Sequence, residues 1–222
     1  MHNNAQGDMT LVHSRARRRL VLACLALAAA AMPASVLAAE PRLDPAATRV
    51  RTFYDALLDC MKRAKELGIQ GRYDTLAPVI RATFDLAAMT RIAVGPSWTA
   101  IPSDQQAALM ENFARMTIAT YASRFDGYSG ERFDVDPTAD VRNADRIVRT
   151  KLVPTDGEPV TLNYLMRGSG QNWKIVDVYL SGSISELATR RSEFGAILKS
   201  GGAKALIDSL RQRGDKLLEP SS

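Results

Sequence analysis

The stretch Trp173–Phe194, WKIVDVYLSGSISELATRRSEF, predicts a buried strand that leads directly into a capped helix. Its first part, up to Leu180, is rich in β-branched and aromatic side chains and is mostly apolar on both alternating faces, as in a strand that is covered on both sides. Gly182 ends the predicted strand. Ser183 stands three residues before Glu186, which is the spacing of a capping box at a helix N-terminus. The rest of the chain is expected to pack around this strand and helix.

Residues 1–38 have the features of a secretory signal peptide. Four arginines between positions 15 and 19 form its basic region, an apolar run over residues 20–31 follows, and Val36-Leu37-Ala38 offers the small residues of a cleavage site. We expect cleavage after Ala38 and export of the mature chain. Residues 39–215 are expected to form a single α+β domain with a helical subdomain, followed by a polar tail over residues 216–222.

Loss of this segment would change both the charge and the set of reactive groups. The formal net charge of +5 would fall to about +2, because four arginines and one aspartate would be removed. A nucleic-acid partner is therefore not expected. Both histidines lie in the segment, and Cys60 is the only cysteine outside it. This composition excludes a histidine-based triad, a His/Cys zinc cluster and an internal disulfide, and we expect no metal and no cofactor.

The first half of the mature chain predicts a layer of helices. Apolar residues at helical spacing indicate a long helix that begins after Asp44 and ends at Gly68, followed by two short helices over residues 73–94. Asp85 is the expected N-cap of the second short helix.

A further helix over residues 103–125 is predicted to begin with a capping box of Ser103 and Gln106. Its apolar surface is too wide for one neighbour to cover. Either this helix is buried in the middle of the domain, or part of its face lines a cavity, for which flexible methionines are well suited.

After Gly127 the periodicity changes from helical to alternating, which indicates strands. They lie near residues 131–135, 146–153, 160–166 and 173–180, and short turns rich in glycine separate them. Such connections join antiparallel neighbours in a meander. The predicted fold class is therefore α+β: an N-terminal helical layer on an antiparallel sheet of about four to five strands, with C-terminal helices.

Asp177 is the one side chain with a possible catalytic role. A buried carboxylate could act as a base. The alternative is a structural ion pair with Arg190 or Arg191 on the following helix, which we favour because an unpaired buried carboxylate is costly. No other catalytic residue is predicted.

A series of residues in a fixed order resembles the MlaC family of periplasmic lipid shuttles in Gram-negative bacteria. The resemblance covers residues 49–210 and rests on Phe84-Asp85, Met89, Arg91, Gly95, Trp98, the Ser103 helix with Tyr121, Tyr128, Gly130, Trp173-Lys174, Asp177-Val178, Gly182 and Ser185. Within the family, the segment DVYLSGSISELATRRSEF is most similar to the hopanoid-associated HpnM branch. Most phospholipid shuttles have one residue fewer between the positions of Gly182 and Phe194.

The resemblance implies an NTF2-like related fold with an apolar cavity between helices and sheet. It further implies a phospholipid or hopanoid ligand, a periplasmic location, and handover between membrane-bound transporter components without a chemical step. We expect a monomer. The predicted cavity residues are Met89, Ile92, Trp98, Met110, Phe113, Met116, Tyr121, Val148, Leu162, Tyr164 and Met166. Two alternatives are an NTF2-like enzyme that uses Asp177 and a structural adaptor with a solid core.

Overall fold

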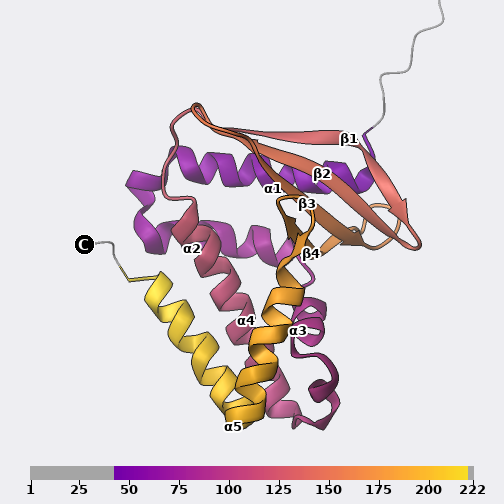
Figure 1. The fold of residues 1–222 in the computed structure, drawn as a ribbon. Coiled ribbons are helices and arrows are strands. Elements are labelled where there is room, and N and C mark those ends of the chain that lie inside the picture. The colour runs from indigo at the N-terminus through magenta and orange to yellow at the C-terminus, as the bar shows by residue number, and fades with distance from the viewer. Residues whose placement is uncertain (1–42, 220–222) are drawn as a thin grey trace, which may run out of the picture. The chain divides into compact units, whose positions relative to one another are not determined.

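The computed structural model describes residues 43–219, so the predicted signal peptide lies outside the described residues. A meander of strands follows a series of helices, and a long C-terminal helix completes the fold (Figure 1). The elements in chain order are α1 (Pro45–Lys62), α2 (Ala64–Thr83), α3 (Leu86–Val94), the 3-10 helix η1 (Gly95–Ala100), α4 (Ser103–Arg124), β1 (Arg132–Arg142), β2 (Asp145–Val153), β3 (Val160–Arg167), β4 (Lys174–Leu180), β5 (Ile184–Ser185) and α5 (Glu186–Leu217). Among these helices, none combines the length and the hydrophobicity that a membrane span requires.

The strands form one antiparallel sheet in the order β1-β2-β3-β4-β5, which confirms the predicted meander and the α+β class. β1 is longer than the sequence pattern indicated, because an irregularity between Val135 and Ala139 lets it continue to Arg142 along β2. The short strand β5 was not predicted. It pairs with β4 through Tyr179 and Ser185 and through Leu180 and Ile184.

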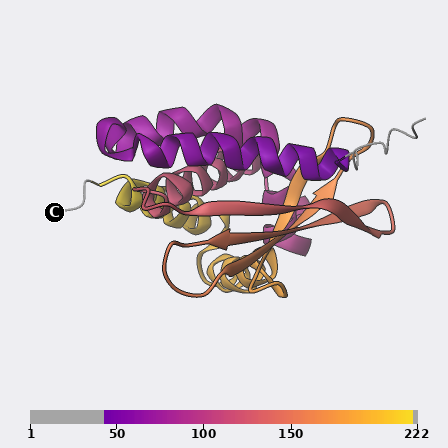
Figure 2. The ribbon, with the colours of Figure 1, turned by 90° about the horizontal axis from the view of Figure 1, so that it is seen from above.

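The helices cover the apolar face of this sheet. α1 runs along β1 and β2, α2 lies beside α1, and α4 packs against both α2 and α5 (Figures 1 and 2). Asp85 caps α3 as expected, since its side chain accepts a hydrogen bond from the Ala88 amide at 2.9 Å. Gly68 and Gly202 both have positive φ values, of 61° and 68°, and both change the direction of a helical segment. In Figure 1 the second of these changes divides α5 into two arms.

Both predicted capping boxes are wrong. Pro102 occupies the N-cap of α4 and has no side-chain acceptor, while the Gln106 side chain donates to the carbonyl oxygens of Trp98 and Ile101 at 2.9 and 3.0 Å. At α5, pairing of β5 with β4 delays the start of the helix. Ser185 is therefore the N-cap in place of Ser183, and its Oγ accepts from the Ala188 amide at 2.9 Å.

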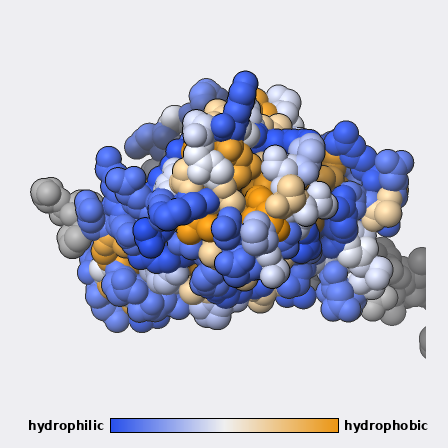
Figure 3. All heavy atoms as spheres, turned by 90° about the horizontal axis from the view of Figure 1, so that it is seen from below, coloured by the Kyte–Doolittle hydropathy of each residue, from blue (hydrophilic) through white to orange (hydrophobic). Residues whose placement is uncertain are grey.

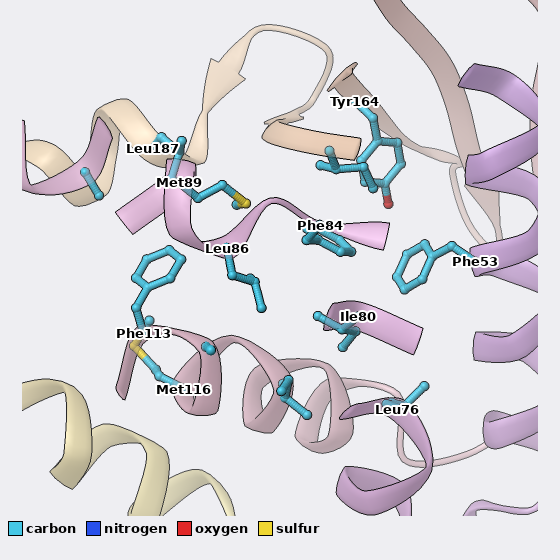
Figure 4. Close-up of a cluster of buried hydrophobic side chains, with 14 of the residues drawn as sticks. Phe53, Leu76, Ile80, Phe84, Leu86, Met89, Phe113, Met116, Tyr164 and Leu187 are labelled. Atoms are coloured by element: carbon cyan, nitrogen blue, oxygen red, sulfur yellow. The ribbon is translucent and has the colours of Figure 1, made fainter. Parts of the chain in front are cut away.

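An aromatic cluster joins the helices to the sheet. Phe53 of α1 lies edge-on to Phe84, with a centroid distance of 5.3 Å, and edge-on to Tyr121 of α4 at 5.5 Å. Tyr54 of α1 stacks on Phe133 of β1 at 4.2 Å. Such pairs contribute about 0.5–1.5 kcal/mol each beyond the burial of their area. Figure 4 shows Phe53, Phe84 and Tyr164 in this cluster.

Candidate functional site: an apolar cavity between helices and sheet

A cavity of about 130 Å³ lies where α3, α4 and the start of α5 meet strands β3 and β4. Most of its wall is apolar, as expected of a site for a hydrophobic ligand. Met89, Phe113, Leu187 and Tyr164 of this wall are visible in Figure 4. The lining residues are Phe84, Met89, Phe113, Thr117, Thr120, Tyr121, Arg124, Phe125, Leu162, Tyr164, Val178, Leu180, Glu186, Leu187 and Arg190.

Tyr164 of the cavity lining belongs to a buried network of hydroxyl groups. The Tyr54 hydroxyl donates to the Tyr164 hydroxyl at 2.9 Å and lies 2.7 Å from the Thr150 hydroxyl. Burial raises the pKa of Tyr54 to about 12 and raises the pKa of Tyr164 and of Tyr121 further above the usual value for tyrosine. These phenols therefore stay neutral, because a phenolate in this low-dielectric position would be costly.

The polar lining residues are Thr117, Thr120, Arg124, Glu186 and Arg190. The three charged residues come from only two elements, the C-terminal end of α4 and the first turns of α5. Arg124 is exposed, and Glu186 and Arg190 are half-buried, so this side of the cavity is its mouth.

The apolar wall continues from the mouth onto the sheet surface. Leu162 of β3 pairs with Leu180 of β4, and Leu180 pairs with Ile184 of β5, so these three side chains share one face of the sheet. Val160 shares that face because it lies two residues before Leu162. Val160 and Ile184 are 46% and 56% exposed, and they extend the apolar surface beyond the cavity. Figure 3 shows a further feature of the exterior, a group of apolar side chains at the centre of the face seen from below, with hydrophilic side chains around it.

The structure brings part of the predicted set of cavity residues together. Met89, Phe113, Tyr121, Leu162 and Tyr164 all line the cavity, and their contact with a ligand stays a prediction. The other predicted residues lie elsewhere. Met116, Val148 and Met166 are buried in the packed core, Trp98 and Met110 are half-buried outside the lining, and Ile92 is 37% exposed.

Several lining residues were missed for physical reasons. Thr117 and Thr120 line the cavity together with Phe113 and Tyr121, and their hydroxyl groups donate to carbonyl oxygens of the preceding helical turn. Val178, Leu180 and Leu187 could have been found, since they belong to the strand and helix that the sequence placed at the centre of the fold. Arg124 and Arg190 could not, because helical spacing alone does not show which way a long charged side chain turns.

The prediction that Asp177 pairs with Arg190 or Arg191 is wrong. One oxygen of the buried Asp177 carboxylate accepts from the amides of Val178 and Leu187, at 2.8 and 3.1 Å. Its other oxygen accepts from the Ser185 hydroxyl at 2.6 Å. The turn that leads into α5 brings these donors to Asp177, so the carboxylate needs no arginine. Asp177 therefore joins β4 to the start of α5, and it is outside the cavity lining.

The two arginines have different surroundings. Arg190 turns toward α4, where its guanidinium lies 3.9 Å from the Met116 sulfur. Burial lowers the pKa of Arg190, and nearby Glu186 and Glu193 oppose this shift. Arg191 packs over Gly95, where a Cβ atom would lie only 2.9 Å from the guanidinium Nε.

Within residues 43–219, no group of three or more His, Cys, Asp or Glu side chains is arranged to hold a metal ion.

A helical layer on an antiparallel sheet, with a mostly apolar cavity between the two, defines the class of this protein as α+β with an internal apolar pocket. The family model described as MlaC protein matches residues 51–212, and the chain belongs to the MlaC family. A solved structure of a phospholipid-binding protein from Ralstonia solanacearum, in complex with a phospholipid, has the same fold with a TM-score of 0.68. It shares 26% sequence identity, and the match covers 78% of this chain and 99% of that chain. No curated protein matches the chain.

Proposed function

We propose that this protein is a periplasmic carrier that shields the tails of a membrane lipid in its cavity and moves the lipid between membrane-bound transporter components. One observation carries the proposal: the apolar cavity between α4, α5 and the sheet, in a chain whose solved relative from Ralstonia solanacearum holds a phospholipid. The family membership supports the same reading.

The physical need for such a carrier follows from the cost of exposing lipid tails. Each methylene group that leaves the bilayer for water costs about 0.8 kcal/mol, so a lipid with long tails crosses an aqueous space very slowly by itself. A protein wall of the kind formed by Phe84, Phe113 and Leu187 removes this cost. No bond has to be made or broken, and the Asp177 carboxylate, which three donors of its own chain hold, favours a binding protein over an enzyme.

The cavity in this structure is small for a ligand-binding site. Its 130 Å³ is below the roughly 300–1,000 Å³ of ordinary ligand sites. Lipid binding therefore requires the walls to move apart. Met89 and the other flexible side chains of the lining allow part of this movement, because thioether side chains adapt to irregular spaces.

We propose a phospholipid or a hopanoid as the ligand. The relative with a bound phospholipid supports the first, and the resemblance of residues 177–194 to the HpnM branch supports the second. We also propose that the chain acts as a monomer without a cofactor, and that its first 38 residues direct it to the periplasm. The last point is supported by the basic and apolar regions of the predicted signal peptide.

A transfer assay between two vesicle populations tests the carrier function. Donor vesicles contain labelled lipids and acceptor vesicles contain none, and the mature protein is added at increasing concentration. We expect transfer that rises with protein concentration and rises further when the acceptor vesicles contain the cognate membrane-bound transporter. A transfer rate that equals the rate without protein would overturn the proposal.

A further inference from the structure

We propose that Arg190, together with Arg124, binds the phosphate group of the lipid at the mouth of the cavity and makes the carrier selective for phosphate-bearing lipids. The proposal rests on the lipid-carrier function proposed above, and it names the part of the site that distinguishes one lipid class from another. Both arginines line the same cavity as the apolar residues that would hold the tails.

The Arg190 side chain does not pair with the carboxylate that its own helix offers. Glu186 lies one turn earlier on α5, at the spacing that favours an ion pair. The Arg190 side chain nevertheless turns toward α4, and its one hydrogen-bond contact is the Met116 sulfur at 3.9 Å. Among the described residues, no carboxylate lies within the 4.0 Å of an ion pair with Arg190. Its fork of donors is therefore left available at the cavity.

A half-buried guanidinium without an anionic group in direct contact is costly, because burial removes water from the charge, and Glu186 and Glu193 offset this cost only without an ion-pair contact. A phosphate group would supply that contact. The planar guanidinium presents parallel N–H donors that match two phosphate oxygens, and such paired bonds are both strong and specific in geometry. The apolar residues Leu180 and Leu187 line the same cavity as Arg190, so a lipid whose tails fill the cavity would bring its headgroup to this arginine.

The charges at the mouth favour a phosphodiester in particular. Arg124, Arg190 and Glu186 leave a net charge of one positive among the lining residues, which equals the one negative charge of a phosphodiester. A phosphomonoester carries about 1.5 to 2 negative charges and would be held less well beside Glu186. Neutral lipids, such as an uncharged polycyclic alcohol, would leave both arginines without a partner.

The test compares lipids that have the same tails and differ only at the headgroup. A phosphatidylglycerol, the corresponding phosphatidic acid, the corresponding diacylglycerol and, separately, inorganic phosphate are titrated into delipidated mature protein. Dissociation constants are measured for the wild type, Arg190→Gln, Arg190→Lys and the matched control Arg191→Gln. The control removes a neighbouring positive charge that packs over Gly95 outside the cavity lining.

We expect the wild type to bind the phosphatidylglycerol about tenfold or more tightly than the diacylglycerol, as for one charge-assisted hydrogen-bonded contact. Arg190→Gln should lose most of this preference while its affinity for diacylglycerol stays unchanged, and Arg190→Lys should keep part of it. Arg191→Gln should keep all of it. If Arg190→Gln also binds diacylglycerol poorly, its fold is impaired and Arg190→Lys decides the question.

Three results would overturn the inference. Equal affinity of the wild type for phosphatidylglycerol and diacylglycerol would reject the phosphate site but leave the lipid carrier intact. Binding of neither lipid would reject the carrier function and the phosphate site together. Tight binding of inorganic phosphate alone, with no gain from the lipid phosphate, would show a site for the free ion.

Discussion

Tyr54 of α1 and Tyr164 of β3 are joined by a hydrogen bond of 2.9 Å between their hydroxyl groups, across the interface between the helical layer and the sheet. Tyr54 also lies 2.7 Å from the Thr150 hydroxyl of β2, so its phenol is connected to two neighbouring strands. Tyr164 also lines the cavity. This pair of tyrosines thus links the stability of the fold to the inner wall of the candidate site.

The first prediction concerns stability at alkaline pH. Burial raises the pKa of Tyr54 to about 12, and it also raises the pKa of Tyr121 and Tyr164 above the value of about 10 for an exposed tyrosine. Above pH 10 the unfolded chain releases these protons while the folded chain retains them. The stability that these protonated phenols contribute to the folded state is therefore complete below pH 10, and it is lost as the pH rises through their pKa values in the folded protein. Denaturant unfolding between pH 8 and pH 12 measures this loss.

Tyr54→Phe provides the control for this prediction. The variant should lose roughly 1–3 kcal/mol of stability at neutral pH, because two buried hydroxyl contacts disappear. Its free energy of unfolding should also fall less steeply above pH 10 than that of the wild type, because the variant lacks the Tyr54 phenol. The difference in slope should be about 1.4 kcal/mol per pH unit. Parallel curves for the wild type and the variant above pH 10 would show that Tyr54 does not contribute.

The second prediction is that Asp177 has a structural role. Asp177→Asn should destabilise the protein by about 1–3 kcal/mol, because the amide weakens the bonds to the Leu187 amide and the Ser185 hydroxyl. Chemical denaturation measures this change. Lipid binding by the folded variant should equal that of the wild type.

Asp134→Asn is the matched control, since this carboxylate lies on β1, is 51% exposed and pairs with Arg132, which is 67% exposed. Its effect on stability should stay within about 0.5 kcal/mol. If Asp177→Asn were as harmless as Asp134→Asn, the carboxylate would not hold the start of α5. If it instead abolished turnover of a small apolar substrate, the enzyme alternative would be correct.

The third prediction is that filling the cavity prevents lipid binding. Leu180→Trp places a large ring in the part of the cavity wall that β4 contributes, and overpacking of this kind costs about 1–3 kcal/mol, which corresponds to about fivefold to 150-fold in affinity. Val141→Trp is the control, since Val141 is 70% exposed on β1 and outside the cavity lining. Equilibrium binding of a lipid with one labelled tail measures both variants. Equal binding by the two would mean that the lipid occupies another part of the molecule.

The fourth prediction concerns export. The mature protein should begin at Ala39, because Val36 and Ala38 supply small residues before the expected cleavage site. The intact mass of the protein recovered from the periplasmic fraction measures this directly. Recovery of the full-length chain in the cytoplasm would contradict both the cleavage and the location.

The architecture could be predicted from the sequence because its strongest signals are local. Alternation in Val160–Arg167 and the turn residues on either side of the strands define the meander, and Asp85 defines the start of α3. The starts of α4 and α5 were placed wrongly for tertiary reasons. The side chain of Gln106 binds η1, and β5 forms a strand pair before α5 can begin.

The site was harder to predict than the fold. Residues such as Phe113 and Leu162 were found because they face the interior, yet Val148 and Met166 face it too and are packed solidly. Whether an inward-facing residue meets a cavity or a neighbour depends on how far two layers stand apart, which no local pattern encodes. The orientation of Arg190 has a similar cause. Ser185 and Leu187 donate to Asp177 only in the folded chain, so Asp177 does not pair with Arg190, and the arginine turns toward α4.

The central claim is that the cavity holds a lipid, and native mass spectrometry tests it most directly. The mature protein is purified from membrane-containing cells without detergent, alongside Leu180→Trp. We predict a wild-type species whose mass exceeds that of the polypeptide by the mass of one lipid, released on collisional activation, and a Leu180→Trp species that is mostly empty. A wild-type protein that carries no lipid, and that takes up none after incubation with vesicles, would contradict the account.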